Sequence, residues 1–380
     1  MSAAATEVVR GRSASPIEVE YRPQPGLARL TIVNLLLNVI TLSIYRFWAK
    51  TRVRRHIWSC IYINGEPLEY TGRGVELFLG ALFVTVALVV PIILIVFFIR
   101  LTFGPESPQL IGFQMLVLLI TTVLWGGAKY LARRYQLSRT LWRGIRFSLA
   151  GSAMVYSLLF FGALLLRGLT MGWATPFMNL NLQEQMTAST LFGDRHFRFK
   201  GRAGPLYPAF ALCWFITLAA AIAAIVFLGY SLSREDSPLL AWLAQLEKGT
   251  SGEPSVESIV TLMAAIFGFY VVAGLAYVAL WTVYVAREMR LFATYTSFEE
   301  ARIALDASAG SLFRLQLGNL LIWLFTLGIA MPFVHQRTVR YHCDLLTVAG
   351  NVDLAAIRQS SADISRTGEG LAAALDLGGI

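Results

Sequence analysis

The stretch Ser59–Gly72, SCIYINGEPLEYTG, alternates apolar and polar residues, passes through a glycine turn at Gly65 and alternates again. This pattern is typical of a β-hairpin and not of a helix. Four other segments resemble it, and we predict five copies of one hairpin separated by long apolar segments. The other copies are Leu137–Gly151 (LSRTLWRGIRFSLAG), Ala188–Gly201 (ASTLFGDRHFRFKG), Tyr295–Gly310 and Cys343–Ala355.

The composition indicates a membrane protein. Of 380 residues, 56% are hydrophobic and 14% are charged, and the mean hydropathy is +0.60. Soluble domains carry about 25% charged residues, so this chain cannot cover itself with polar surface. The net charge of +9 comes from basic residues that flank apolar segments. This placement favours orientation in a membrane and contact with anionic lipid headgroups over binding to nucleic acid.

Seven apolar segments predict an α-helical multi-pass membrane protein. Three of them have polar or helix-breaking residues where a span should be most apolar, and they align with one another: Leu27–Tyr45, Met154–Phe177 and Phe313–Val334. In each, a short apolar helix meets a break before a second, amphipathic helix, which predicts re-entrant elements. Three ordinary spans are the alternative. The other four segments exceed the length needed to cross a bilayer, about 20 residues, and we predict that they span: Val75–Ile99, Gln109–Ala128, Leu206–Tyr230 and Ser258–Ala286.

The distribution of basic residues decides between these alternatives. Arginine and lysine gather around all five hairpin segments, whereas loop 101–108 has neither and loop 231–255 has only Arg234 and Lys248. The positive-inside rule places the hairpins and both termini in the cytoplasm. That requires an even number of crossings between hairpins, hence four spans plus three re-entrant elements. We predict a disordered cytoplasmic tail over 1–22, a membrane domain of internal repeats over 23–358 and a flexible C-terminal tail over 359–380.

The densest mixture of basic and aromatic residues lies between Ile44 and Trp58. At helical spacing, the aromatic side chains can sit at the membrane interface while the basic ones reach lipid phosphates. We interpret the segment as a membrane anchor, with a specific headgroup site as the alternative. RNA binding is disfavoured, because no recognition module surrounds the segment. The predicted lipid-binding surface consists of Arg46, Phe47, Trp48, Lys50, Arg52, Arg54, Arg55 and Trp58.

The stretch Thr41–Arg55 (TLSIYRFWAKTRVRR), followed by Leu68–Gly72 (LEYTG) and Glu76–Gly80 (ELFLG), resembles the YjgN family of bacterial inner-membrane proteins, a family of unknown function. The resemblance continues at Thr326–Ile329 (TLGI) and covers about residues 25–358, although Ala330–Phe333 (AMPF) departs from the Tyr-Arg-Phe-Trp pattern. It implies a multi-pass protein of the bacterial inner membrane and supplies no catalytic residues.

Four polar residues within the apolar segments are candidates for an intramembrane site: Asn34, Asn38, Arg167 and Asn319. Arg167 is the most costly of them at depth. It is either a counter-ion or substrate contact, or the solvated tip of a re-entrant element.

The four histidines and three cysteines match no metal-site spacing, and the chain has no nucleophile, acid–base or nucleotide-binding motif. We therefore expect no catalytic residues, no metal, no cofactor and no enzymatic activity. The predicted function is a membrane-organising or lipid-interacting scaffold whose partners are anionic membrane lipids. The alternative is a transporter or channel that uses the broken helices near the midplane.

Overall fold

Strands and helical segments alternate regularly along the chain. The computed structural model describes residues 17–233, 256–350, 352–354 and 356–359. These residues belong to two compact units. Unit 1 comprises Met1–Arg202, Arg290–Asp306 and Leu315–Ile380, and unit 2 comprises Ala203–Met289 and Ala307–Arg314. Residues 1–16 and 360–380 of the predicted tails, and 234–255 of the second predicted loop, lie outside the described residues.

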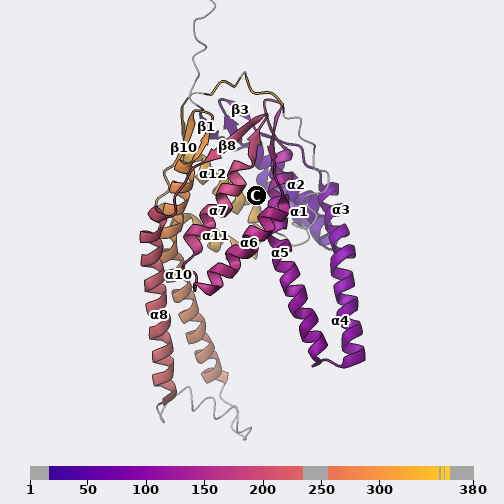
Figure 1. Cartoon of the computed structure of the whole chain (residues 1–380), viewed down its shortest axis with the longest axis vertical. Coiled ribbons are helices and arrows are strands. Elements are labelled where there is room, and N and C mark those ends of the chain that lie inside the picture. The colour runs from indigo at the N-terminus through magenta and orange to yellow at the C-terminus, as the bar shows by residue number, and fades with distance from the viewer. Residues whose placement is uncertain (1–16, 234–255, 351, 355, 360–380) are drawn as a thin grey trace, which may run out of the picture. The chain divides into compact units, whose positions relative to one another are not determined.

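The described strands all belong to unit 1 and pair in antiparallel fashion (Figure 1). A three-stranded sheet contains β1 (Val19–Tyr21), β2 (Ile61–Ile63) and β3 (Glu66–Pro67) in that order. An eight-stranded sheet follows chain order from β4 to β11, so consecutive strands are always neighbours. Its strands are β4 (Glu69–Tyr70), β5 (Thr140–Trp142), β6 (Ile145–Leu149), β7 (Thr190–Phe192), β8 (Arg195–Phe199), β9 (Thr296–Phe298), β10 (Ala301–Leu305) and β11 (Leu346–Ala349).

Four of the five predicted hairpins form, each around a two-residue turn. The first turn residue has a left-handed φ in every case, which suits the right-handed twist of the flanking strands. In two turns the second residue is a glycine that is also left-handed, with φ of 80° at Gly65 and 74° at Gly144. The predicted glycine turn at Gly65 is confirmed, and Gly144 and Gly193 occupy the equivalent turns of the second and third hairpins. The first turn residues are Asn64 (φ 50°), Arg143 (54°), Gly193 (58°) and Glu299 (51°).

The fifth predicted hairpin is wrong, because Cys343–Ala355 contributes the single strand β11 and the end of a helix. After β11 the chain passes the β9–β10 turn so closely that a Cβ on Gly350 would lie 2.5 Å from the Glu300 carbonyl oxygen. Val352 and Ile357 then enter the core of unit 1, beside Trp142, Phe192 and Phe298. The N-terminal tail also ends differently from the prediction, because β1 pairs with β2.

The helices account for the rest of the described fold, and two hairpins of long helices contain four candidate membrane spans. Among the long helices, α4 and α5 lie side by side in unit 1, and α8 packs on α10 in unit 2 (Figure 1). The spans are Gly74–Phe103, Pro108–Ser138, Gly204–Phe227 and Phe267–Tyr295. The helices are α1 (Leu27–Ile40), α2 (Arg46–Trp58), α3 (Gly74–Val84), a π-helical turn (Thr85–Val89), α4 (Val90–Phe103), α5 (Pro108–Ser138), α6 (Ala153–Leu169), α7 (Thr175–Ala188), a 3-10 turn (Gly204–Leu206), α8 (Tyr207–Ser233), α10 (Val256–Tyr295), α11 (Ala309–Phe325) and α12 (Met331–Leu345).

Each helical excursion begins and ends at paired strands. The long excursion α3–α5 lies between β4 and β5, whose register pairs Glu69 with Leu141, and the excursion α8–α10 lies between the paired strands β8 and β9. The short excursions α1–α2, α6–α7 and α11–α12 lie between β1 and β2, β6 and β7, and β10 and β11. After every excursion the chain therefore returns to a strand that is paired with the one it left.

The three short excursions share one helix–turn–helix geometry. In the second, the Thr170 hydroxyl donates to the Leu166 carbonyl (2.7 Å) and accepts from the Ala174 backbone N–H (3.0 Å). Met171 and Gly172 are both left-handed, which closes the C-terminus of α6 and reverses the chain. Thr41 and Thr326 make the same two hydrogen bonds in the other hairpins. We call these turns, Thr41–Tyr45, Thr170–Ala174 and Thr326–Ala330, the hairpin tips.

The turn threonines should contribute more to stability than other helical threonines. Thr326→Val removes the acceptor of the Ala330 N–H as well as a donor, so we expect a loss of about 1–2 kcal/mol. Thr122→Val is the matched control, because the Thr122 hydroxyl only donates to the Leu118 carbonyl within α5. Thermal or denaturant unfolding in detergent measures both variants, and equal losses would contradict the role of the tip.

Candidate functional site in the helical hairpins

The three short hairpins place polar side chains at equivalent levels near their tips. In the second hairpin, the guanidinium of Arg167, three residues before the turn threonine, donates to the Oδ1 atom of Asn179, nine residues after it. The same two positions hold Asn38 and Lys50 in the first hairpin and Trp323 and His335 in the third.

The first and third hairpins meet in unit 1. Val53 and Ile57 of α2 pack in one apolar cluster with Leu30 of α1 and Val339 of α12. These contacts explain why α2 carries an apolar stripe between its arginines, and they bring the polar residues of α2 close to those of α12.

Arg54 of α2 is almost completely buried, with 1% of its surface exposed. Its Nη1 atom donates to the Tyr70 hydroxyl at 3.1 Å, and its guanidinium carbon lies 5.8 Å from the centre of the Tyr70 ring. Arg54 therefore ties α2 to β4 and also supplies a positive charge inside the protein.

His335 of α12 faces this charge. Burial lowers the pKa of His335, and the neighbouring Lys50 and Arg54 lower it further. The imidazole is consequently neutral at pH 7, so one of its ring nitrogens is a hydrogen-bond acceptor.

Asn34 lies on the buried face of α1, together with Leu27 and Thr31. Only 5% of Asn34 is exposed, and neither its amide oxygen nor its amide nitrogen has a hydrogen-bond partner among the described residues. Leaving a buried polar group unsatisfied costs about 1–3 kcal/mol. Asn34 is therefore a candidate contact for a polar ligand.

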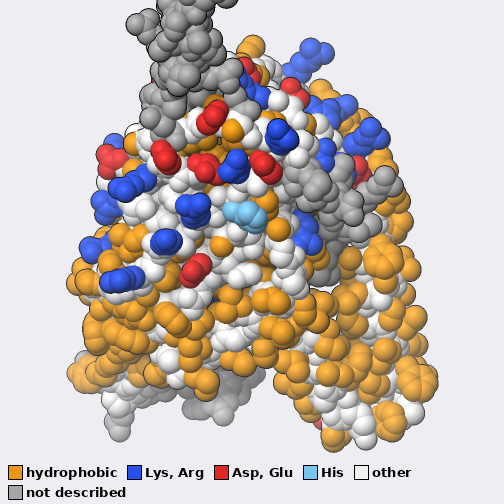
Figure 2. Space-filling model, turned by 45° about the horizontal axis from the view of Figure 1, so that its top comes forward, with side chains coloured by type: hydrophobic (Ala, Val, Ile, Leu, Met, Phe, Trp, Pro, Cys, Tyr) orange, Lys and Arg blue, Asp and Glu red, His pale blue; other side chains and the backbone are white. Residues whose placement is uncertain are grey.

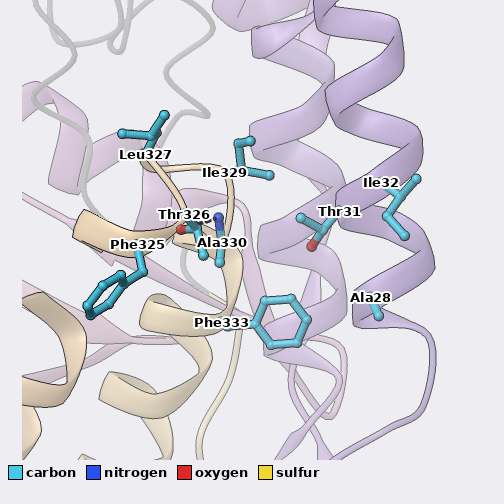
Figure 3. Close-up of a pocket in the computed structure, with 9 residues that line it drawn as sticks. All are labelled: Ala28, Thr31, Ile32, Phe325, Thr326, Leu327, Ile329, Ala330 and Phe333. Carbon is cyan, nitrogen blue, oxygen red and sulfur yellow. Dashed lines mark hydrogen bonds between the residues drawn. The ribbon is translucent and has the colours of Figure 1, made fainter. Parts of the chain in front are cut away.

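An apolar groove of about 470 Å³ lies beside these residues, between α1 and the tip of the third hairpin (Figure 3). Figure 3 shows Thr31 and Ile32 on the α1 side of the groove and Thr326 on the side of the third tip. The groove suits a hydrocarbon chain better than a polar solute, because nearly all its lining atoms are apolar. It is lined by Ala28, Thr31, Ile32, Phe325, Thr326, Leu327, Ile329, Ala330 and Phe333.

The four candidate intramembrane residues do not form one site. Arg167 bonds to Asn179, and Asn319 donates from Nδ2 to the Thr338 hydroxyl at 3.2 Å, each within its own hairpin. Asn34 and Asn38 both belong to α1, and no hydrogen bond joins any two of the four residues in the described part of the chain. Their role in ligand binding stays a prediction.

The predicted lipid-binding surface on α2 is only partly exposed. Phe47 is buried against Leu77 and Tyr135, and Trp58 donates to the Thr140 hydroxyl at 3.0 Å. The placement of Phe47 and Trp58 at the membrane interface is therefore corrected, because strands and spans that are distant in sequence cover them. Arg54 is likewise inside the protein. Arg46, Arg52 and Arg55 are exposed, and Trp48 and Lys50 are half-buried.

Sequence analysis missed Lys129 of α5 as a site residue. The ammonium of Lys129 lies 5.1 Å from the centre of the Phe160 ring of α6. The positive charge of Arg167 repels this ammonium. The sequence did contain a signal for this residue. Lys129 follows the apolar segment closely after the pair Gly126 and Gly127, where a second helix can approach.

The described residues contain no group of three or more His, Cys, Asp or Glu side chains placed to hold a metal ion. Cys60, Cys213 and Cys343 are free and buried. Burial, with a smaller contribution from Asp344, raises the pKa of Cys343 to about 11. Cys343 is therefore a neutral thiol at pH 7 and a poor nucleophile.

Comparison with known proteins assigns a family. The family model described as "Bacterial protein of unknown function (DUF898)" matches residues 24–374. The chain belongs to this family. Inner membrane protein YjgN of Salmonella typhimurium (strain LT2) is 33% identical over 118 residues, which cover 31% of this chain and 27% of the relative. Inner membrane protein YjgN of Escherichia coli (strain K12) is 31% identical over 119 residues, with the same two shares.

The predicted resemblance is thus confirmed as distant and partial homology. The chain spans only about a quarter of the length of these relatives. No solved structure matches the chain significantly. Together with the four candidate spans, these findings describe a membrane protein of unknown function.

The environment of His335 predicts that the protein loses stability in acid. The unfolded chain takes up a proton near the ordinary histidine pKa of about 6.5, whereas folded His335 resists protonation to a lower pH. Stability should therefore be highest above about pH 6.5 and fall as the pH drops below it. Unfolding midpoints in detergent should show a smaller acid loss in His335→Gln than in the parent. The control is His196→Gln on the exposed part of β8, and an equal effect of both variants would contradict this account.

Proposed function

We propose that this chain is a bacterial inner-membrane protein that acts as a non-enzymatic, lipid-interacting and membrane-organising scaffold. The exposure of the three hairpin tips carries the proposal. Leu42 and Leu327 are each 88% exposed and Met171 is 82% exposed, although all three are left-handed. Glycine and asparagine are the residues that adopt this conformation most readily in water. Large apolar side chains at these positions fit contact with hydrocarbon.

The lengths of the hairpins support insertion from one side of the membrane without a full crossing. Helix α1 has 14 residues and helices α6 and α11 have 17 each, so they reach about 21–26 Å at 1.5 Å per residue. The hydrocarbon core is about 30 Å thick, and the second helix of each hairpin returns to the neighbouring strand. Three such hairpins occupy space in one leaflet without a counterpart in the other. This asymmetry is a means of organising the surrounding lipid.

Charge supports a cytoplasmic location for the sheets and both termini. Figure 2 shows lysine and arginine side chains over the part of the surface that carries the strands, and hydrophobic side chains over the helical part. Exposed Arg46 and Arg52 on α2 lie next to the first tip and are suited to anionic headgroups. The loop after α4 carries Glu106 and no basic residue. The name of the relatives supports the inner membrane as the location.

A transporter or channel is the second candidate, favoured by the broken helices and by the unsatisfied amide of Asn34. Transport of a polar solute needs a polar path open to both faces. The groove at the third tip has apolar walls, which suit a lipid chain better. Solute flux across proteoliposomes that exceeds the protein-free rate would favour the transporter over the scaffold.

The insertion of the tips is testable by fluorescence quenching. A fluorophore attached to Leu327→Cys in proteoliposomes should be quenched strongly by lipids brominated at the middle of the acyl chain. The native cysteines Cys60, Cys213 and Cys343 are buried and react slowly in the folded protein.

The matched control is Glu106→Cys, which also lies in a turn between two apolar helices but follows a full span. Its fluorophore should escape mid-chain quenching, because that turn lies beyond the hydrocarbon. Equal, weak quenching at both positions would place the tip outside the hydrocarbon and overturn the proposal.

A further inference from the structure

The junction of α5, α6 and α7 is rigidly built. A Cβ on Gly126 would lie 2.7 Å from the Phe160 Cβ, and a Cβ on Gly127 would lie 2.5 Å from the Ser157 hydroxyl. The glycine pair therefore allows α6 to pack directly on the backbone of α5. This contact fixes the level at which side chains of α5 and α6 face each other.

Two positive charges meet at this junction. Arg167 reaches from α6 to Asn179 of α7, and its half-buried side chain leaves the Nε atom without a partner in the described structure. Lys129 places its ammonium over the Phe160 ring, within the field of Arg167. Neither cation forms an ion pair with a described carboxylate, so the two charges repel each other without compensation from the protein.

The location of the pair makes this repulsion costly. Lys129 follows the apolar part of α5 on the side nearer the strands, and Arg167 lies three residues before the second hairpin tip. Cations in apolar surroundings are expensive unless an anion accompanies them. A guanidinium with a free N–H edge and a nearby ammonium are the groups that bind phosphate oxygens best in proteins.

The first hairpin repeats the same combination of groups. Its equivalent positions hold Asn38 and Lys50, so an amide and a cation recur with their helices exchanged. Two of the three hairpins thus hold one cation and one amide just above the tip; the amide oxygen accepts from the cation in the second hairpin, and in the first the Asn38 Oδ1 atom has no hydrogen-bond partner among the described residues. A merely structural ion pair would pair a cation with a carboxylate instead.

We propose that Lys129, Arg167 and Asn179 bind the phosphate group of an anionic membrane lipid at the junction of α5, α6 and α7. The inference deepens the proposed lipid-interacting function and rests on it. Arg167 and Lys129 neutralise the phosphate, and the Asn179 amide orients the guanidinium. The acyl chains of the lipid extend from there towards the tip, along the exposed apolar side chains of Leu166, Leu169 and Met171.

The test compares lipid binding by the full-length protein in detergent, measured by native mass spectrometry. The probes are phosphatidylglycerol and phosphatidylcholine with identical acyl chains, and inorganic phosphate is added as a competitor in a third arm. The parent should prefer phosphatidylglycerol. Lys129→Gln with Arg167→Gln should lower that preference by about 5-fold per charge, or about 25-fold in total.

Three variants keep the result interpretable. Lys129→Gln alone leaves the Arg167–Asn179 hydrogen bond intact and should lose about 5-fold if the double variant does not fold. Arg167→Lys keeps the charge and should retain most of the preference. Arg100→Gln removes an exposed arginine from the last turn of α4 and should have no effect.

An unchanged preference in Lys129→Gln and in the double variant would overturn the site. Quenching at the Leu327 tip would in that case leave the proposed function standing. Displacement of phosphatidylglycerol by inorganic phosphate at an equal concentration would overturn the lipid as the source of the anion and assign the site to a free phosphate group. Absence of tip quenching would count against the proposed function whatever the lipid preference.

Discussion

Backbone hydrogen bonding between the strands that flank each helical excursion is the constraint on which the structure depends. The strand β4 ends the eight-stranded sheet and leaves one edge open, and open sheet edges are not found in contact with lipid, where unsatisfied backbone groups are too costly. Under the proposed topology both sheets lie outside the hydrocarbon, and both ends of every excursion lie with the paired strands that flank it. In that topology, helix pairs that differ in length and polarity share one requirement, which is that the chain returns to the side of the membrane from which it left.

The short hairpins meet this requirement through their tips. A threonine that closes one helix and begins the next, followed by two left-handed residues, reverses the chain within five residues in all three copies. Leu42, Met171 and Leu327 accept a conformation that usually favours glycine or asparagine, and each places an apolar side chain at the far end of its hairpin. The same short geometry brings a polar side chain on each second helix to the level just above the tip, namely Lys50, Asn179 and His335. The proposed lipid contact and the placement of these polar side chains thus both depend on one turn.

Local sequence patterns predicted much of this fold. The predictions that were wrong concern features set by contacts between residues that are distant in sequence. The alternation around Gly65, Gly144 and Gly193 identified hairpins because a two-residue turn is a local feature. The fifth copy failed because Gly350 and Val352 follow a path set by the β9–β10 turn, which no local pattern reveals. The prediction that Phe47 and Trp58 anchor the chain at the membrane interface failed for the same reason. Their partners, Tyr135 and Thr140, are more than 80 residues away in sequence. Arg167 could be selected from the sequence because a charged residue in an apolar segment is energetically unfavourable. Lys129 could be selected only from the structure, which places it against Phe160 of α6.

The sidedness of three strands tests the central claim most directly. Single cysteines replace the exposed residues Glu69 (β4), Arg198 (β8) and Thr347 (β11), and an impermeant thiol reagent is applied to intact cells and to permeabilised cells. The short excursion α6–α7 separates the first two positions, and α11–α12 separates the last two, in addition to one pair of long helices in each interval. If both short excursions return, all three cysteines are labelled only after permeabilisation. Labelling of Arg198→Cys from the opposite side to Glu69→Cys and Thr347→Cys would show that the short helices cross the membrane, and would contradict the account.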